Sequence, residues 1–232
     1  MTNELTKKAG IALILGALIS IFRVLPIVLS DGVTGDNFPP ESLEDVVFFS
    51  QLQGWHISHV LILVLIPLLI FGVAVFARDA AENGQASAGI MALIGLTLSM
   101  VLFSVATVLD GFVLPAVTAD IGEAALTGDS HSGALALFTH EAASIFGGTA
   151  SALLLITALF IGIALLHGLG AQWLGGLGVV LGILSTLGYL IGVLNLNISD
   201  GFSRVGPLLM LIFFYLLAVG IAMVRRGSTT TT

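Results

Sequence analysis

The chain alternates between long apolar runs and short polar connections. Six runs hold about 20 residues each, the length of an α-helix that crosses a hydrocarbon core of about 30 Å. These runs are apolar on every face, whereas strands of a membrane β-barrel alternate between apolar and polar positions. The pattern therefore predicts an all-α fold, a polytopic membrane bundle of six transmembrane helices. The predicted spans are residues 9–29, 57–77, 88–109, 142–166, 174–194 and 205–224.

The polar positions inside these runs predict an internal repeat. The first run carries a glycine, a serine and an Asp-Gly pair at the same intervals as the third run, and the fifth run gives a weaker copy. Three similar helices, each with a following partner, predict three helix hairpins in a single domain of residues 1–226, followed by a disordered tail at 227–232. The matching positions are Gly16, Ser20 and Asp31-Gly32, then Gly95, Ser99 and Asp110-Gly111, then Gly182, Thr186 and Asn197.

Composition identifies an integral membrane protein in contact with the lipid bilayer. Hydrophobic residues make up 57% of the chain and charged residues 9%, whereas soluble domains hold about 25% charged residues. With six spans, five basic residues near the ends of the predicted helices lie on one side of the membrane, which predicts cytoplasmic N and C termini. They are Lys7, Lys8, Arg78, Arg225 and Arg226. The expected location is the cell membrane of a prokaryote. The net charge of -7 comes from the outer connections and argues against a nucleic-acid partner.

Histidines and carboxylates gather near the outer ends of the predicted spans. His56 and His59 begin span two, three residues apart and therefore on one helix face. Asp110 ends span three, and His140 with Glu141 precedes span four. An ionisable residue within a membrane is costly and has to find a partner, so these positions predict an outer polar site.

The chemistry of this predicted site has two readings that involve a cofactor. Two facing imidazoles in an apolar slot can hold the iron of haem b, with a redox role. Alternatively, the three histidines with Asp110 or Glu141 can bind a divalent transition metal such as zinc, iron or copper. The His-x-x-His spacing of His56 and His59 lacks the glutamate of the His-Glu-x-x-His motif, which makes the motif itself weak.

A structural reading of the same residues competes with both. Arg23 lies within span one, and Asp110 is the partner expected for it if spans one and three adjoin, as a buried ion pair that fixes helix register. Asp110 followed by glycine would then be a helix end and a turn. Further outer polar residues are Asn195, Asn197 and Arg204.

Other functional classes remain open or are excluded. A non-catalytic carrier, sensor or accessory subunit is the main alternative, because repeated helix pairs and prolines within spans occur in small transporters. The absence of cysteine excludes disulfides and thiolate ligands. A serine hydrolase is disfavoured because no Gly-x-Ser-x-Gly sequence is present, whereas the histidines leave a membrane metallohydrolase open. Whether the protein is an enzyme is thus undecided by the sequence.

The fifth run, GLGVVLGILSTLGYLIGVLNL, is rich in glycines spaced four residues apart. Such spacing allows close helix packing and offers a surface for a homo-oligomer or a membrane partner subunit. In this run and in its span count, the chain resembles a family of uncharacterised six-span bacterial membrane proteins known as a domain of unknown function. The resemblance implies the six-span fold and no particular activity.

Overall fold

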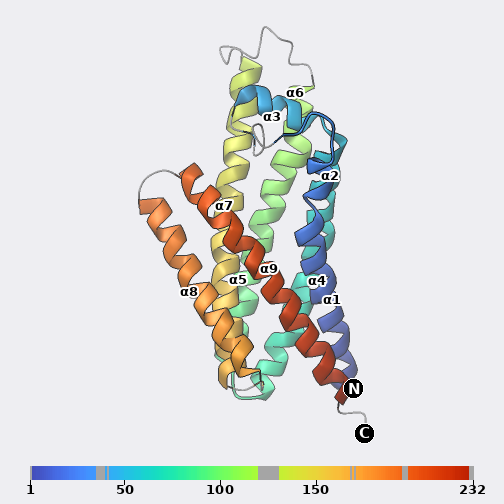
Figure 1. Cartoon of the computed structure of the whole chain (residues 1–232), viewed down its shortest axis with the longest axis vertical. Coiled ribbons are helices and arrows are strands. Elements are labelled where there is room, and N and C mark those ends of the chain that lie inside the picture. Colours follow the sequence, from blue (N-terminus) through green and yellow to red (C-terminus); the bar gives the residue numbers. More distant parts are fainter. Residues whose placement is uncertain are drawn as a thin grey trace. The chain divides into compact units, whose positions relative to one another are not determined.

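The computed structural model of the protein describes residues 2–34, 40, 42–119, 131–167, 169, 171–194 and 198–229, with backbone only at residues 2, 185, 188, 190–194, 198–209 and 229. Every regular element in these ranges is helical (Figure 1), which confirms the all-α prediction for them. The elements are α1 Thr2–Phe22, α2 Leu25–Val28, α3 Leu43–Ser50, α4 Gln53–Glu82, α5 Ala86–Val108, η1 Leu109–Val113, α6 Leu114–Thr118, α7 His131–His167, α8 Gln172–Leu194 and α9 Ile198–Thr229.

Five helical segments in the described ranges are long and apolar enough to cross a membrane. They are Asn3–Val28, Gln53–Glu82, Ala86–Thr118, His131–His167 and Met210–Ser228. The fifth predicted span coincides with α8, whose described apolar stretch, Gln172–Leu184, is shorter than a span. Length and composition thus make this a multi-pass helical membrane protein.

The chain divides into two compact units. The first comprises Met1–Ile21, Val64–Val101 and Gly148–Thr232, and the second comprises Phe22–Leu63 and Leu102–Gly147. Within the first unit, helices meet closely at glycines: a Cβ added to Gly162 on α7 would lie 2.8 Å from the carbonyl oxygen of Gly175 on α8. A Cβ on Gly182 would lie 2.5 Å from Cβ of Leu159. The close packing predicted from the glycines of the fifth run is therefore present.

Three helix ends of the first unit meet where the basic residues lie. Thr6 near the start of α1 donates a hydrogen bond of 2.8 Å to Asp79 near the end of α4. At the end of α9, a Cβ on Gly227 would lie 2.6 Å from the carbonyl oxygen of Asn3. Lys7, Arg78 and Arg226 therefore belong to the same end of this unit, as the charge pattern predicted.

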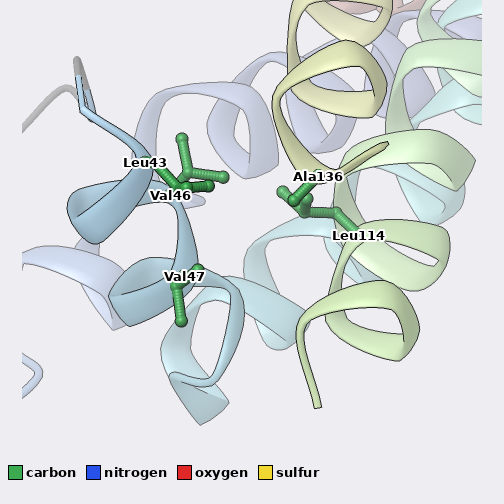
Figure 2. Close-up of a cluster of buried hydrophobic side chains, with 5 residues drawn as sticks. All are labelled: Leu43, Val46, Val47, Leu114 and Ala136. Carbon is green, nitrogen blue, oxygen red and sulfur yellow. The ribbon is translucent and has the colours of Figure 1, made fainter. Parts of the chain in front are cut away.

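The short helix α3 belongs to the second unit. The side chain of Ser42 accepts a hydrogen bond from the Asp45 amide, and the Asp45 carboxylate accepts one from the Ser42 amide, which forms a capping box. Figure 2 shows the apolar cluster that this helix helps to form. Its members are Leu43, Val46 and Val47 of α3, Leu114 of α6 and Ala136 of α7. The apolar side of α3 is thus buried against protein.

Several element boundaries differ from the prediction. The first predicted span breaks after Phe22, and Arg23 lies in the turn before α2, because Pro26 has no amide hydrogen to continue the helix ladder. The third predicted span continues beyond Leu109, through η1 and α6 to Thr118. The last helix continues to Thr229, three residues into the segment 227–232 that was predicted to be a tail.

The proposed repeat keeps its glycines but not its Asp-Gly pairs. Gly16 packs against Leu69 and Gly95 against Thr157, so both permit a close helix contact. However, Asp31-Gly32 forms a turn in which Gly32 has a φ of 81°, whereas Asp110-Gly111 lies inside a helix. The corresponding Asn197 lies outside the described residues. A repeat of three hairpins stays a prediction.

Candidate functional site at Asp110

The predicted outer site is built around a π-helical turn. Residues Leu109–Val113, with sequence LDGFV, widen the helix, and the amide of Leu114 donates to the carbonyl of Leu109. Such turns within α-helices are rare and are frequent at functional sites, because they redirect side chains and alter the backbone hydrogen-bond ladder. Asp110 is therefore a residue in the middle of a continuous helix, and the prediction of a helix end and a turn at this position is wrong.

Side chains at the start of α4 bind the carbonyl groups of this turn. Trp55 donates its indole Nε1–H to the carbonyl oxygen of Asp110 over 2.9 Å. The Nδ1 atom of His56 lies 3.3 Å from the carbonyl oxygen of Gly111. Gly111 itself packs directly on His59, since a Cβ at this glycine would lie 2.5 Å from Cγ of His59. The absence of a side chain at Gly111 is what allows α4 to approach the π-helical turn.

The Asp110 carboxylate lies between two imidazoles that come from different helices. Its Oδ2 is 3.4 Å from Nε2 of His59 on α4, and its Oδ1 is 3.1 Å from Nδ1 of His140 on α7. The side chains of His59, Asp110 and His140 are 8%, 17% and 20% exposed, so all three are shielded from water. We call these three residues the histidine–aspartate cluster.

The contacts of His59 indicate where hydrogens lie on its ring. Nδ1 of His59 is 2.8 Å from the carbonyl oxygen of Trp55, and a carbonyl only accepts, so Nδ1 carries a hydrogen. Without a second proton, the lone pair of Nε2 would face a carboxylate oxygen of Asp110, which is repulsive. A proton between Nε2 and Oδ2 makes this contact attractive, either as imidazolium with carboxylate or as imidazole with carboxylic acid. The pair is therefore arranged to hold one exchangeable proton.

Two residues with buried hydroxyl groups lie close in sequence to members of this cluster. Ser58 precedes His59 and is fully buried, and Thr107 lies one helical turn before Asp110 and is 2% exposed. Neither hydroxyl has a hydrogen-bond partner among the described residues. Because an unpaired buried hydroxyl is unfavourable, each is suited to bind a water molecule or a small polar ligand.

The remaining predicted site residues do not join the cluster. Arg23 is half-buried and forms no ion pair with Asp110 in the described part of the chain, where the partners of that carboxylate are the two histidines. The predicted Arg23–Asp110 pair is thus replaced by histidine contacts. Glu141 is exposed, Arg204 is described by its backbone alone, and Asn195 and Asn197 lie outside the described residues.

Sequence reasoning missed the role of Trp55. Only 6% of this side chain is exposed, and the centroid of its ring lies 4.8 Å from that of His59. The position of Trp55, four residues before His59 and thus on the same helix face, is the signal that could have identified it.

The described residues contain no group of three histidine, aspartate or glutamate side chains arranged to hold a metal ion. The contacts explain this finding, since His59 and His140 approach different oxygens of Asp110. What the arrangement offers directly is a carboxylate that contacts two imidazoles.

The fold and the cluster define a multi-pass α-helical membrane protein with a shielded histidine–aspartate site. Comparisons with protein family models, with curated proteins and with solved structures gave no significant match. Functional conclusions therefore depend on the site itself.

Proposed function

We propose that the histidine–aspartate cluster is a proton-binding site in a membrane carrier or sensor. The observation that carries this proposal is the contact of the Asp110 carboxylate with His59 and His140 at a π-helical turn. Chains of carboxylates and histidines within membrane helices are characteristic of proton relays in pumps and transporters. Histidine suits this role because its charge changes near physiological pH.

The membrane setting of the proposal follows the charge pattern. In this proposal the chain has six spans, with α8 as the fifth, so that both termini lie in the cytoplasm and the cluster lies near the outer face of a prokaryotic cell membrane. Protons from the outer side would then reach His140, the most exposed member of the cluster. Gly176 of α8, where no atom lies within 4 Å of an added Cβ, leaves a surface for a second copy or a partner subunit.

Trp55 provides an internal reporter for the proposed proton. Its ring contacts His59, and its indole nitrogen is bonded to the backbone of Asp110. The chain has two tryptophans, so Trp173→Phe leaves Trp55 as the sole emitter. We expect its fluorescence to fall as the pH is lowered, because an imidazolium next to an indole quenches its emission. The measurement is a fluorescence titration of the purified protein in detergent.

Two variants separate the cluster from other titrating groups. In the Trp173→Phe background, His59→Gln should abolish the fluorescence transition. His167→Gln is the matched control, because His167 is an exposed histidine at the other end of α7, and it should leave the transition unchanged. The proposal would be refuted if the emission of Trp55 did not change over the whole pH range in which the protein stays folded.

A second candidate function is binding of haem b or a transition metal. It is favoured by the tautomers of His56 and His140, whose Nδ1 atoms face the carbonyl of Gly111 and the carboxylate of Asp110. Histidine ligands of metals commonly donate one ring N–H to such groups and bind through the other nitrogen, which would be Nε2 here. Absorption spectra of the oxidised and reduced protein, with metal analysis of the same sample, test this candidate. A colourless and metal-free sample, after expression with haem precursor and metals supplied, would exclude it.

A further inference from the structure

Arg23 is a charged residue inside a segment, Asn3–Val28, that is long and apolar enough to cross a membrane. Among the described residues it takes part in no ion pair and no hydrogen bond of its side chain. The next carboxylate along the chain, Asp31, is exposed and forms no ion pair in the same part of the structure. A cation within a membrane segment is costly and is almost always paired. The counter-charge of Arg23 is therefore to be sought outside the protein.

The surroundings of this arginine are apolar and open to the outside of the bundle. On the inner side of α2, Ile27 is buried and packs in a cluster with Phe49. On the other side, Phe22, Leu25 and Leu29 follow each other at intervals of three and four residues and so form one stripe. They are 55%, 44% and 78% exposed. In a membrane segment, such a stripe is covered by lipid, and the arginine next to Phe22 borders it.

The position of Arg23 along the segment brings it within reach of lipid headgroups. It lies at the opposite end of this segment from Lys7 and Lys8, about 12 Å inward of Asp31 at 1.5 Å per residue. Arginine side chains extend along apolar surface towards the membrane interface. A bilayer also thins locally around an arginine at this depth, which brings headgroups closer. Arg23 itself is half-buried, so that its charged group is accessible.

The chemistry of the guanidinium group selects the partner. It has five N–H donors and no acceptor, and its planar fork matches the geometry of a phosphate or a carboxylate. Such charge-assisted pairs are frequently bidentate and are stronger than neutral hydrogen bonds. Every phospholipid carries a phosphate directly above its acyl chains. A phospholipid therefore offers both the anion for Arg23 and the hydrocarbon that covers the adjacent stripe.

We propose that Arg23 binds the phosphate group of one phospholipid. The lipid belongs to the leaflet at the end of the first span opposite Lys7 and Lys8, and its acyl chains lie along Phe22 and Leu25. This lipid site goes beyond the proton-binding function and does not depend on it.

The contact can be measured directly by magic-angle-spinning nuclear magnetic resonance. Protein with arginine labelled by ¹³C at Cζ is reconstituted in phosphatidylcholine vesicles in phosphate-free buffer. The ³¹P nucleus of a lipid phosphate weakens the Cζ signal only when the two nuclei are close. Arg23→Lys keeps the charge and removes the label, so its difference from the wild type isolates Arg23 from the other arginines. We expect a dephased signal in this difference, and its absence would overturn the proposal.

A second arm separates lipid phosphate from soluble phosphate. The same labelled protein is reconstituted in galactolipid vesicles, which contain no phosphorus, with inorganic phosphate in the buffer. We expect the dephasing that belongs to Arg23 to be lost. Dephasing as strong as in phosphatidylcholine would show a site for a soluble anion and would contradict the assignment to a lipid.

Thermal unfolding in a phosphate-free maltoside detergent tests the energetic effect. Phosphatidylcholine should raise the melting temperature above the value with diacylglycerol of the same acyl chains by about 5–10 °C, once the lipid exceeds its dissociation constant about 100-fold. In Arg23→Gln the two lipids should act equally. Lys8→Gln is the matched control, because it removes an exposed positive charge from the same helix, and it should keep the difference.

The lipid-free protein provides the remaining check. Without lipid, Arg23→Gln should unfold at the same temperature as the wild type or a higher one, because it removes a charge that has no partner. A lower melting temperature would show that Arg23 is paired within the protein, and equal lipid effects in the wild type would show that the phosphate is not bound. Either result would overturn the proposal.

Discussion

Asp110→Ala is expected to lower the free energy of unfolding by about 1–3 kcal/mol, because it leaves the buried Nε2 atom of His59 without its partner. His59 is the side chain that loses most, since its Nε2 faces Asp110 and only 8% of the side chain is exposed. Denaturant-induced unfolding in detergent micelles, followed by circular dichroism, measures the loss.

Two further variants distinguish the cluster from a general effect of charge. Glu141→Gln is the matched control, since it removes one negative charge next to His140 from an exposed position, and its effect should stay within about 0.5 kcal/mol. Combining Asp110→Ala with His59→Gln should cost less than the sum of the single changes, because both remove the same contact. Additive effects would show that Asp110 and His59 do not interact.

Gly111→Ala is expected to lower stability by about 1–3 kcal/mol through overpacking. The added methyl group would lie 2.5 Å from Cγ of His59, and it would meet the Cβ of His59, which cannot rotate away. Either α4 or the π-helical turn has to shift, so the fluorescence of Trp55 should change as well. Thermal unfolding and the emission spectrum of the Trp173→Phe protein report these two effects.

Gly147→Ala is the control for this substitution. Gly147 belongs to the same unit, and the nearest atom to an added Cβ is 3.9 Å away, on Ala106. It should therefore be tolerated with little change in stability or emission. If Gly111→Ala behaves like Gly147→Ala, the close approach of His59 to the π-helical turn is not as described.

Much of the fold was predictable because membrane helices depend on local composition. The apolar runs identify the helices, and the short connection with Gly84 at a φ of 77° marks the turn between α4 and α5. Exact ends were harder to predict, because hydropathy does not show where a helix continues into water. The helices that carry Asp110 and His140 both extend beyond their predicted spans, to Thr118 and back to His131.

The members of the candidate site were predictable, but their contacts were not. His59, Asp110 and His140 were identified because ionisable residues at membrane helices need partners. The Asp110 carboxylate contacts histidines instead of Arg23 because of the turn at Pro26 and the π-helical turn at Asp110. Neither turn follows from hydropathy. Asp79 was overlooked because Arg78, one residue earlier, made that helix end appear simply basic, whereas Asp79 is buried and bonded to Thr6.

The most direct test of the proton-binding cluster is a pH titration of the protein, with ¹⁵N-labelled histidine, by nuclear magnetic resonance. Groups that share a proton through one carboxylate titrate together, with midpoints that belong to the set and not to a single residue. The account predicts that His59 and His140 change over a common pH range, and that Asp110→Asn separates and shifts their transitions while His167 is unaffected. Transitions of His59 and His140 that are independent of each other and unchanged in Asp110→Asn would contradict the proposed function.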